Sequence, residues 1–382
     1  MTRTLLVDTN RAAYPIYQAL CTLGHEVWVM GGKPEETLAK LAPNYAQLDY
    51  SDTDKLAAFI EEKGFDYLVP GCTDLSYQVC AEINNGRFPG IDTPANTFAI
   101  NTKSEFRKVA GELGLPVPRV LAQENASDAE SVIVKPADSF SGRGITILHD
   151  PTPGKLAEAF ASACKTSKSG SAIIEEFVTG QLFSHSAFIS KGELVADFIV
   201  QEDCTTNPFT VDTSRVVTNF AGEMVESLRG DVSRLASSLH LPDGLMHTQF
   251  IARDDRYWII EMTRRCPGDI YSLLIEFSTG YPYAASYAAP FVGNAPCLPD
   301  ADAAQDRIIR HTVTSKDGAS LWGFRFSRPV DIRLFVPLAT SGDFIGASPY
   351  GRAGIFFFRA SSEREQETLY QKILAGELYS FS

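Results

Sequence analysis

The stretch that most constrains the fold of this chain runs from Ser131 to Ile145 and reads SVIVKPADSFSGRGI. Its first residues are mostly β-branched and predict a short strand, which Pro136 prevents from continuing. The loop that follows consists mainly of small residues, so its backbone N–H groups can come close to an anion. Lys135 places a positive charge beside this loop. We therefore interpret the stretch as a grip for the phosphates of a nucleotide triphosphate.

The composition restricts the class of protein and its partners. The chain has 382 residues, which suggests two or three domains, and its 44% hydrophobic and 21% charged residues are typical of an ordinary globular protein. The formal net charge of −13 argues against nucleic acid or an anionic membrane as the main partner. No apolar run approaches the length of a membrane span.

The cysteines and the N-terminus indicate a cytoplasmic location. The seven cysteines are scattered without CxxC spacing, so reduced thiols fit better than a disulfide framework or a zinc site. The first residues lead straight into a short strand broken by an acid, which is unlike a signal peptide. We therefore expect a cytoplasmic protein.

Strand and helix patterns alternate over roughly the first hundred residues. Residues 3–8 predict a strand, residues 14–23 a helix and residues 25–30 a second strand, and this βαβ pattern then repeats. The alternation predicts a doubly wound parallel sheet, in which ligands bind at the carboxyl ends of the strands. Asp8–Arg11 and Gly71–Asp74 occupy such ends, either as ligand-binding loops or simply as polar turns.

The remainder of the chain changes character. A helix pattern over 101–113 leads into a proline-rich linker, and a hairpin pattern occupies 246–262. From about residue 303 the pattern is mainly β, and it closes with a helix near 363–374. The first strand is not followed by GxGxxG, and GxxxxGK[ST] is absent from the sequence, so neither a Rossmann dinucleotide site nor a P-loop is supported.

Four features occur in a fixed order along this sequence. Lys103 opens a helix, and Lys135 precedes the small-residue loop. Glu175–Val178 end a strand, and the hairpin runs into Ile260–Asp269 with the sequence IEMTRRCPGD. This ordered set resembles the ATP-grasp superfamily of carboxylate–amine ligases, which includes biotin carboxylase, the carbamoyl phosphate synthase large subunit and L-amino acid ligases. The resemblance covers nearly the whole chain.

The resemblance implies a mixed α/β and α+β architecture in three parts. Residues 1–100 would form the preceding doubly wound α/β domain. Residues 101–297 would form the ATP-grasp domain with its two α+β subdomains, including a lid at about 116–178. Residues 298–382 would form a mainly β, α+β C-terminal domain.

The resemblance also implies a binding role for a set of residues around ATP. The expected phosphate contacts are Lys103, Lys135 and a covering loop that includes Ser139, Ser141, Gly142, Arg143 and Gly144. The expected adenine hinge is the backbone of Glu175, Glu176, Phe177 and Val178. The expected ligands of Mg²⁺, or of Mn²⁺, are Glu261 and Gln249, twelve positions apart and facing each other across the hairpin. Arg265, together with Lys135, would act at the transferred phosphate.

The function that the resemblance implies is an ATP- and Mg²⁺-dependent ligase. It would join a small-molecule carboxylate to an amine or ammonia through an acyl phosphate, and it could be a homodimer. One alternative is a carboxylating or purine-biosynthesis-type ligase of the same superfamily. Another is a non-catalytic ATP-binding relative, because Gln249 replaces a metal carboxylate, Thr263 replaces an asparagine, and Leu182 replaces a ribose-binding glutamate.

Several of these residues have a purely structural interpretation as well. Glu261 lies in an apolar strand and needs a partner, which is either a metal or Arg264. Arg143 either shields the phosphates or is merely exposed, and His185 and His247 fit the core better than a substrate site. Cys266 fits a packing thiol, because a His/Asn arrangement to activate it is missing. We expect substrate contacts from Asp8–Arg11, Gly71–Asp74, the 201–215 segment with Arg215, and Arg265.

Overall fold

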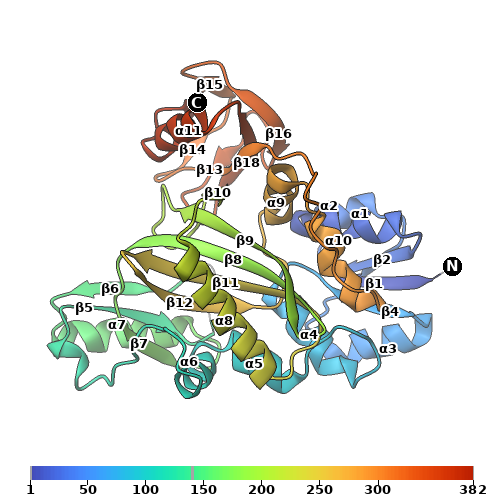
Figure 1. Cartoon of the computed structure of the whole chain (residues 1–382), viewed down its shortest axis with the longest axis horizontal. Helices are drawn as coiled ribbons and strands as arrows, with labels where there is room; N and C mark the ends of the chain where they lie inside the picture. Colours follow the sequence, from blue (N-terminus) through green and yellow to red (C-terminus); the bar gives the residue numbers. More distant parts are fainter. Residues whose placement is uncertain (1, 139–141, 382) are drawn as a thin grey trace.

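The computed structural model describes residues 2–138 and 142–381 (Figure 1). The N-terminal sheet lies at the right of this view, the central sheet and the teal lid at the left and below, and the C-terminal strands at the top. Within the described residues, no helix is long and apolar enough to cross a membrane.

The N-terminal part is a four-stranded parallel sheet with strand order β3-β2-β1-β4, which confirms the predicted parallel sheet. Its strands are β1 (Arg3–Val7), β2 (Glu26–Gly31), β3 (Tyr45–Gln47) and β4 (Tyr67–Pro70). Its helical segments are η1 (Arg11–Ala13), α1 (Tyr14–Thr22), α2 (Thr37–Leu41), α3 (Thr53–Lys63) and α4 (Asp74–Asn84). Side-chain caps from Asp52 and Thr73 begin α3 and α4 by accepting backbone N–H bonds.

Two helices replace the single helix expected over 101–113. The first is α5 (Pro94–Asn101), which begins at the Thr93 cap, and the second is α6 (Lys103–Glu112). Thr102 has an extended backbone between them, with φ −91° and ψ 116°. Lys103 is therefore the first residue of a helix, as predicted.

The lid is a three-stranded antiparallel sheet with order β6-β5-β7, covered by one helix. Its elements are β5 (Ser131–Pro136), β6 (Thr146–His149), α7 (Pro153–Thr166) and β7 (Ala172–Glu176), preceded by η2 (Ala126–Asp128). The lid has a hydrophobic core of its own, which includes Val132, Leu156 and Ile174. This separate core lets the strand that carries Lys135 form a compact subdomain.

The central and C-terminal strands form one antiparallel eight-stranded sheet with order β12-β11-β8-β9-β10-β13-β18-β16. Its strands are β8 (Gln181–Ser190), β9 (Glu193–Asp203), β10 (Thr213–Val217), β11 (Gly244–Arg253), β12 (Arg256–Thr263), β13 (Arg307–Thr314), β16 (Asp331–Pro337) and β18 (Arg352–Ala360). Because β13 pairs directly with β10, backbone hydrogen bonds cross the boundary expected at residue 298.

Helices and short strands complete these two regions. The helical segments are α8 (Gly222–Ser238), α9 (Tyr271–Thr279), α10 (Tyr283–Ala288), η3 (Ala289–Val292) and α11 (Glu363–Leu374). The short strands are β14 (Ala319–Ser320), β15 (Phe324–Phe326), β17 (Phe344–Ile345) and β19 (Tyr379–Phe381). The predicted closing helix at 363–374 is confirmed.

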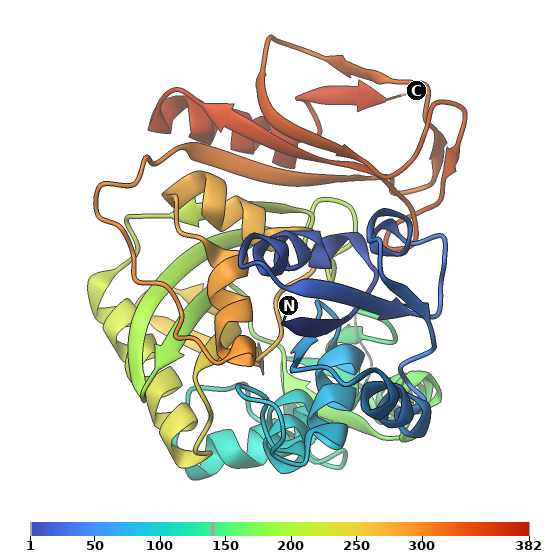
Figure 2. The ribbon, with the colours of Figure 1, turned by 90° about the vertical axis from the view of Figure 1, so that its right-hand side faces the viewer.

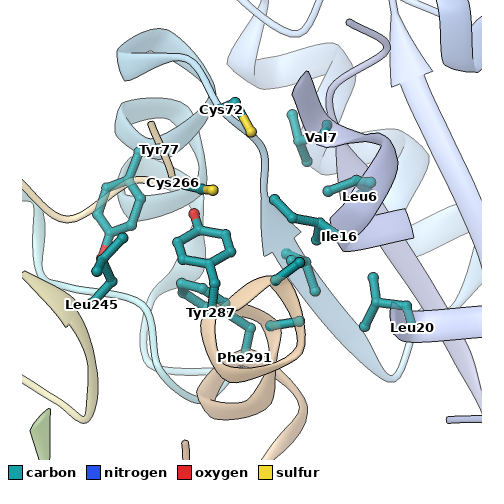
Figure 3. Packing of buried hydrophobic residues seen from close by; sticks show 14 of the residues in the cluster. Leu6, Val7, Ile16, Leu20, Cys72, Tyr77, Leu245, Cys266, Tyr287 and Phe291 are labelled. Carbon is teal, nitrogen blue, oxygen red and sulfur yellow. The ribbon is translucent and has the colours of Figure 1, made fainter. Parts of the chain in front are cut away.

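One hydrophobic cluster joins the N-terminal sheet to the central region. Helix α10 packs beside α1 in both ribbon views (Figures 1 and 2). Figure 3 shows Cys72 and Cys266 from the two regions among Tyr77, Tyr287 and aliphatic side chains. Cys266 is 1% exposed within this cluster, which supports its interpretation as a packing thiol.

Candidate active site

A cavity of about 1150 Å³ lies where the N-terminal sheet, the lid, the central sheet and the C-terminal strands meet. Lys135 in the lid and Glu261 in the central hairpin both line it, so the two halves of the expected site share one cleft. The predicted site residues that line it are Lys103, Lys135, Gly142, Glu176, Phe177, Val178, Gln249, Glu261 and Arg265. Ser139 and Ser141 lie outside the described residues.

Glu175 is at the centre of a buried ion-pair triad. Its Oε2 lies 2.7 Å from Lys135 Nζ, and its Oε1 lies 2.6 Å from Arg107 Nε. All three side chains are at most 8% exposed. Burial alone would raise the pKa of Glu175, but the charges of Lys135 and Arg107 lower it below its ordinary value. Glu175 is thus an anion that holds the Lys135 ammonium in place.

This geometry gives the Glu175 side chain a role that the sequence did not predict. The expected place of its backbone in the adenine hinge stays a prediction, and its side chain is fully buried and is not among the described cavity-lining residues. Its neighbours Glu176, Phe177 and Val178 do line the cavity. The reason for the difference is strand alternation, which turns one side chain of the pair 175–176 inward and the other outward.

Arg107 is a site residue that the sequence analysis missed. Its Nη2 donates to the Ile260 carbonyl at 2.9 Å, directly before Glu261, while its Nε pairs with Glu175. Arg107 thereby ties the lid strand β7 to the hairpin strand β12 through α6. A signal was present in the sequence, because Lys103 and Arg107 are four residues apart and share a helix face.

Apolar side chains line the hinge end of the cavity. They come from the linker, the lid and the central sheet, and they are Pro118, Ile133, Ile145, Ile147, Val178, Leu182 and Ile251. Glu176 lies at this end as well and pairs with Arg119 at 2.7 Å in a solvent-exposed ion pair. Pockets of this kind, with an apolar lining and a few polar groups, suit a flat organic ring.

The small-residue loop reaches the cavity through Gly142, whose φ is +70°. A Cβ at this position would lie 2.3 Å from the Cβ of Phe209, which also lines the cavity. Glycine is therefore required here both by the backbone conformation and by the close approach. Gly144 also has positive φ but faces Thr166, and the Arg143 guanidinium lies 5.9 Å from the centre of the Tyr350 ring.

Gln249 and Glu261 are directly opposite each other in the register of β11 and β12, which confirms their predicted pairing across the hairpin. Glu261 is exposed, and both residues line the cavity. Burial therefore does not oblige Glu261 to have a partner, and the alternative that Arg264 neutralises it is wrong. Arg264 is buried elsewhere and pairs with Asp92 at 3.2 Å.

The residues present fit a magnesium ion that is bound jointly with a nucleotide. Among the described residues, no group of three or more His, Cys, Asp or Glu side chains could hold a metal by itself. Glu261 offers one carboxylate, and Gln249 and Thr263 offer neutral oxygens on the same cavity wall. Mg²⁺ is commonly held by one or two carboxylates together with substrate phosphates.

Arginines and acids line the end of the cavity at the N-terminal sheet. Arg265 Nε lies 2.9 Å from Asp74 Oδ1, and Arg352 is paired with Asp269. Burial raises the pKa of the nearby Asp8 to about 6, although backbone N–H groups of Asn10 and Cys72 bond to its carboxylate. These residues come from three separate parts of the chain, which is the arrangement expected of a substrate end.

Arg11 lines the same end of the cavity. Among the described residues it lies within ion-pair distance of none of the carboxylates, and partial burial lowers its pKa. Asp269 and Ile270 also line the cavity and have φ of +53° and +55°, a backbone conformation that is costly for a β-branched residue. A half-buried guanidinium without an acidic partner is suited to an anionic ligand.

Other residues singled out in the sequence lie away from the main cavity. His185 is fully buried and lies 2.9 Å from Asp197, and His247 is 6% exposed and lies 3.0 Å from Ser186. The expectation that Arg215 contacts substrate is wrong, because it faces a second cavity and pairs with Glu367. The preceding loop does reach the main cavity, through Cys204 and residues 208–211.

The comparisons with known proteins agree with this geometry. Residues 129–272 match the family model described as ATP-grasp domain. The chain contains an ATP-grasp domain. This domain spans the lid strands, the hinge, the hairpin and the start of α9, and so includes Lys135, Gln249, Glu261 and Arg265.

Relatives of the ATP-grasp domain have several recorded activities. A formate-dependent phosphoribosylglycinamide formyltransferase from Azoarcus sp. is 27% identical over 186 residues, which cover 46% of this chain and 47% of that protein. The match thus spans about half the length of this relative. The Anaerococcus prevotii phosphoribosylglycinamide synthetase (TM-score 0.77, 17% identity) and the Bacillus licheniformis L-amino acid ligase (TM-score 0.77, 16% identity) each cover 100% of this chain and 99% of their own. These structures share the fold of the whole chain.

Proposed function

We propose that this protein is an ATP- and Mg²⁺-dependent ligase that joins a small-molecule carboxylate to an amine or ammonia through an acyl phosphate. One observation carries the proposal. A single cavity is lined by Lys103 and Lys135, an apolar hinge, an exposed carboxylate on a hairpin and a charged end built from the N-terminal sheet. These are the parts that a nucleotide triphosphate and a second, polar substrate require.

The charges of the cavity suit phosphoryl transfer. ATP brings about four negative charges, so cations must surround its phosphates as the γ-phosphoryl group moves. Lys103 and Lys135 would bind the phosphates, and the Glu175 side chain would keep the Lys135 ammonium fixed in its position. Arg265, held by Asp74, would bind the transferred phosphoryl group and the reacting carboxylate. A fixed arrangement of this kind costs little reorganisation during the reaction.

The proposed chemistry proceeds in two displacements. A carboxylate oxygen of the substrate attacks the γ-phosphorus, the bond to the β–γ bridging oxygen breaks, and ADP leaves. The amine nitrogen then attacks the acyl carbon, the acyl–oxygen bond breaks, inorganic phosphate leaves and the nitrogen loses a proton. The protein would position the reactants and keep water from the acyl phosphate.

Glu261 and Gln249 would hold the divalent cation, Mg²⁺ or Mn²⁺, with the phosphates as its other ligands. The cation would supply positive charge at the β- and γ-phosphate oxygens. Phe177 and Val178 would hold the adenine ring against the apolar hinge end, and Gly142 would let the covering loop approach the phosphates. We keep Ser139, Ser141, Arg143 and Gly144 as proposed contacts of the same loop.

The remaining expectations stay proposals. We propose that the chain is divided into functional parts at 1–100, 101–297 and 298–382, with a lid at about 116–178. We also propose a cytoplasmic protein and a homodimer. Seven free cysteines support a reducing compartment.

The proposal is tested by ADP release. The purified protein with ATP and Mg²⁺ is offered pairs of small carboxylates and amines, and the product is identified by its mass. We expect ADP release that requires one carboxylate, and Lys135→Met should lower it by at least about a hundredfold. Unchanged ADP release in this variant would contradict the proposed phosphate grip.

Two other functions are distinguished by the same measurement. A purine-biosynthesis-type or carboxylating ligase is favoured by the relatives named as formate-dependent formyltransferase and phosphoribosylglycinamide synthetase. It predicts that formate, bicarbonate or a phosphoribosyl amine triggers ADP release. A non-catalytic ATP-binding protein predicts nucleotide binding without substrate-dependent ADP release.

A further inference from the structure

The Gln249 side chain is hydrogen-bonded to a buried carboxylate that the sequence analysis did not single out. Gln249 Nε2 donates to Glu202 Oε2 at 2.7 Å, and Ser184 Oγ donates to Glu202 Oε1 at 2.8 Å. Ser184 Oγ also lies 2.9 Å from the Tyr271 hydroxyl. Glu202 is 3% exposed and is not among the described cavity-lining residues, whereas Gln249 is. Glu202 therefore reaches the cavity through Gln249.

Backbone pairing fixes these side chains relative to one another. Gln249 of β11 is opposite Glu261 of β12 on one side and opposite Ser184 of β8 on the other. Glu202 of β9 is opposite Leu182, two residues before Ser184, and is therefore a diagonal neighbour of Ser184 on the same face. These four side chains form a row across the sheet, from the exposed Glu261 to the buried Glu202. Its geometry depends on strand register and not on a flexible loop.

The buried carboxylate determines which amide atom of Gln249 faces it. An ionised carboxylate only accepts hydrogen bonds, so the amide turns its NH₂ group toward Glu202. The amide oxygen, Oε1, then points away from Glu202. An oxygen is the kind of ligand that Mg²⁺ prefers, whereas an NH₂ group in the same place would repel a cation.

Burying Glu202 in this place costs stability. Glu202 is 3% exposed, and the nearby Arg310 pairs with Asp269 instead of Glu202. The side chains that donate to Glu202, Ser184 and Gln249, are both neutral. A carboxylate that is buried without a paired cation is expensive, and an apolar side chain of similar volume would avoid the cost. A role in orienting the neighbouring Gln249 amide explains why a carboxylate is buried here despite this cost.

We propose that Glu202 is a positioning residue that holds the Gln249 amide with its oxygen toward the cavity, which makes a neutral glutamine a ligand of the divalent cation. This inference rests on the proposed function, because it concerns the cation that accompanies ATP. It also explains why position 249 is neutral. A glutamate there would bring two carboxylates within hydrogen-bonding distance, so the negative charge expected at 249 lies at 202 instead.

The proposal predicts the effect of exchanging the two residues. In Gln249→Glu combined with Glu202→Gln, the new glutamine can donate to the new glutamate and still accept from Ser184. The carboxylate then lies on the cavity wall beside Glu261. Gln249→Glu alone lacks this compensation, and Gln249→Met removes the amide oxygen altogether.

The experiment measures the binding of Mn²⁺ in the presence of a non-hydrolysable ATP analogue, from the electron paramagnetic resonance signal of free Mn²⁺. We expect the exchanged variant to bind Mn²⁺ about tenfold more tightly than the wild type and Gln249→Met to bind it about tenfold more weakly. Gln201→Glu adds the negative charge of the single variant Gln249→Glu, but at a residue that lines the second cavity. This matched control should bind Mn²⁺ within about twofold of the wild type.

A second measurement without metal compares thermal midpoints. Gln249→Glu should lower the midpoint, and adding Glu202→Gln should recover most of the loss. Midpoint changes that simply add, or an exchanged variant with unchanged Mn²⁺ affinity, would overturn this inference while the wild type still binds Mn²⁺ with the nucleotide. A wild type without nucleotide-dependent Mn²⁺ binding would overturn the proposed function as well.

Discussion

Replacing Glu175 by glutamine should destabilise the protein strongly while leaving both cations of the triad in place. The substitution keeps the size and shape of the side chain but removes its charge. Lys135 and Arg107 lie 2.7 Å and 2.6 Å from the two carboxylate oxygens. Both cations would then be buried side by side, without the anion between them.

The size of the effect follows from this geometry. Two unit charges about 4 Å apart interact by about 4 kcal/mol at an effective dielectric constant of about 20. Removing one partner from a buried ion pair typically costs about 3–5 kcal/mol. We therefore expect Glu175→Gln to lower the free energy of unfolding by about 3–5 kcal/mol. Lys135→Met should cost less, because Glu175 keeps Arg107 as its partner.

The assay is thermal unfolding with and without an ATP analogue and Mg²⁺. Glu175→Gln should lower the midpoint of the free protein but gain more from the nucleotide, because the phosphates replace the lost negative charge beside Lys135. In Lys135→Met, the nucleotide should raise the thermal midpoint much less than it does in the wild type. Glu176→Gln is the matched control, because its ion pair with Arg119 is exposed and contributes at most about 1 kcal/mol. A Glu175→Gln midpoint equal to that of this control would refute the reasoning.

Three further predictions follow from other parts of the cavity. Gly142→Ala should cost about 1–2 kcal/mol of stability because its φ is +70° and the new Cβ would lie 2.3 Å from Phe209 Cβ; thermal midpoints that show no loss would contradict this. Arg11→Gln should raise the KM of one small-molecule substrate while leaving the KM of ATP unchanged, and an equal rise in both would place Arg11 elsewhere. The Asp8 carboxyl should titrate near pH 6 instead of 3.8 in carbon NMR. Because its pKa is raised in the folded state, its contribution to stability should fall as the pH rises from about 4 to about 6; a midpoint near 4 would show that burial does not perturb it.

The sequence was informative wherever structure depends on neighbours along the chain. The parallel N-terminal sheet, the helix at 363–374 and the helix start at Lys103 all follow from local periodicity and capping. The opposition of Gln249 and Glu261 was implied by the family resemblance and not by counting from the turn. Counting would pair Gln249 with Ile260, and a β-bulge between Gln249 and Phe250 shifts the register by one residue.

Contacts between distant segments could not be read in this way. Glu175 meets Lys135 and Arg107, which come from different elements, so the sequence did not predict that its side chain fixes Lys135. Glu202 reaches Gln249 across an intervening strand, and an isolated acid in an apolar strand carries no motif. The pairing of β10 with β13 is equally non-local, because it depends on how the whole sheet assembles.

The measurement that tests the account most directly is a crystal structure of the protein with a non-hydrolysable ATP analogue and Mn²⁺, using anomalous scattering to locate the metal. We expect the triphosphate between Lys103 and Lys135, and Mn²⁺ between the phosphates and the Glu261 carboxylate with Gln249 beside it. A nucleotide bound outside the cavity, or Mn²⁺ bound away from Glu261, would contradict the central claim.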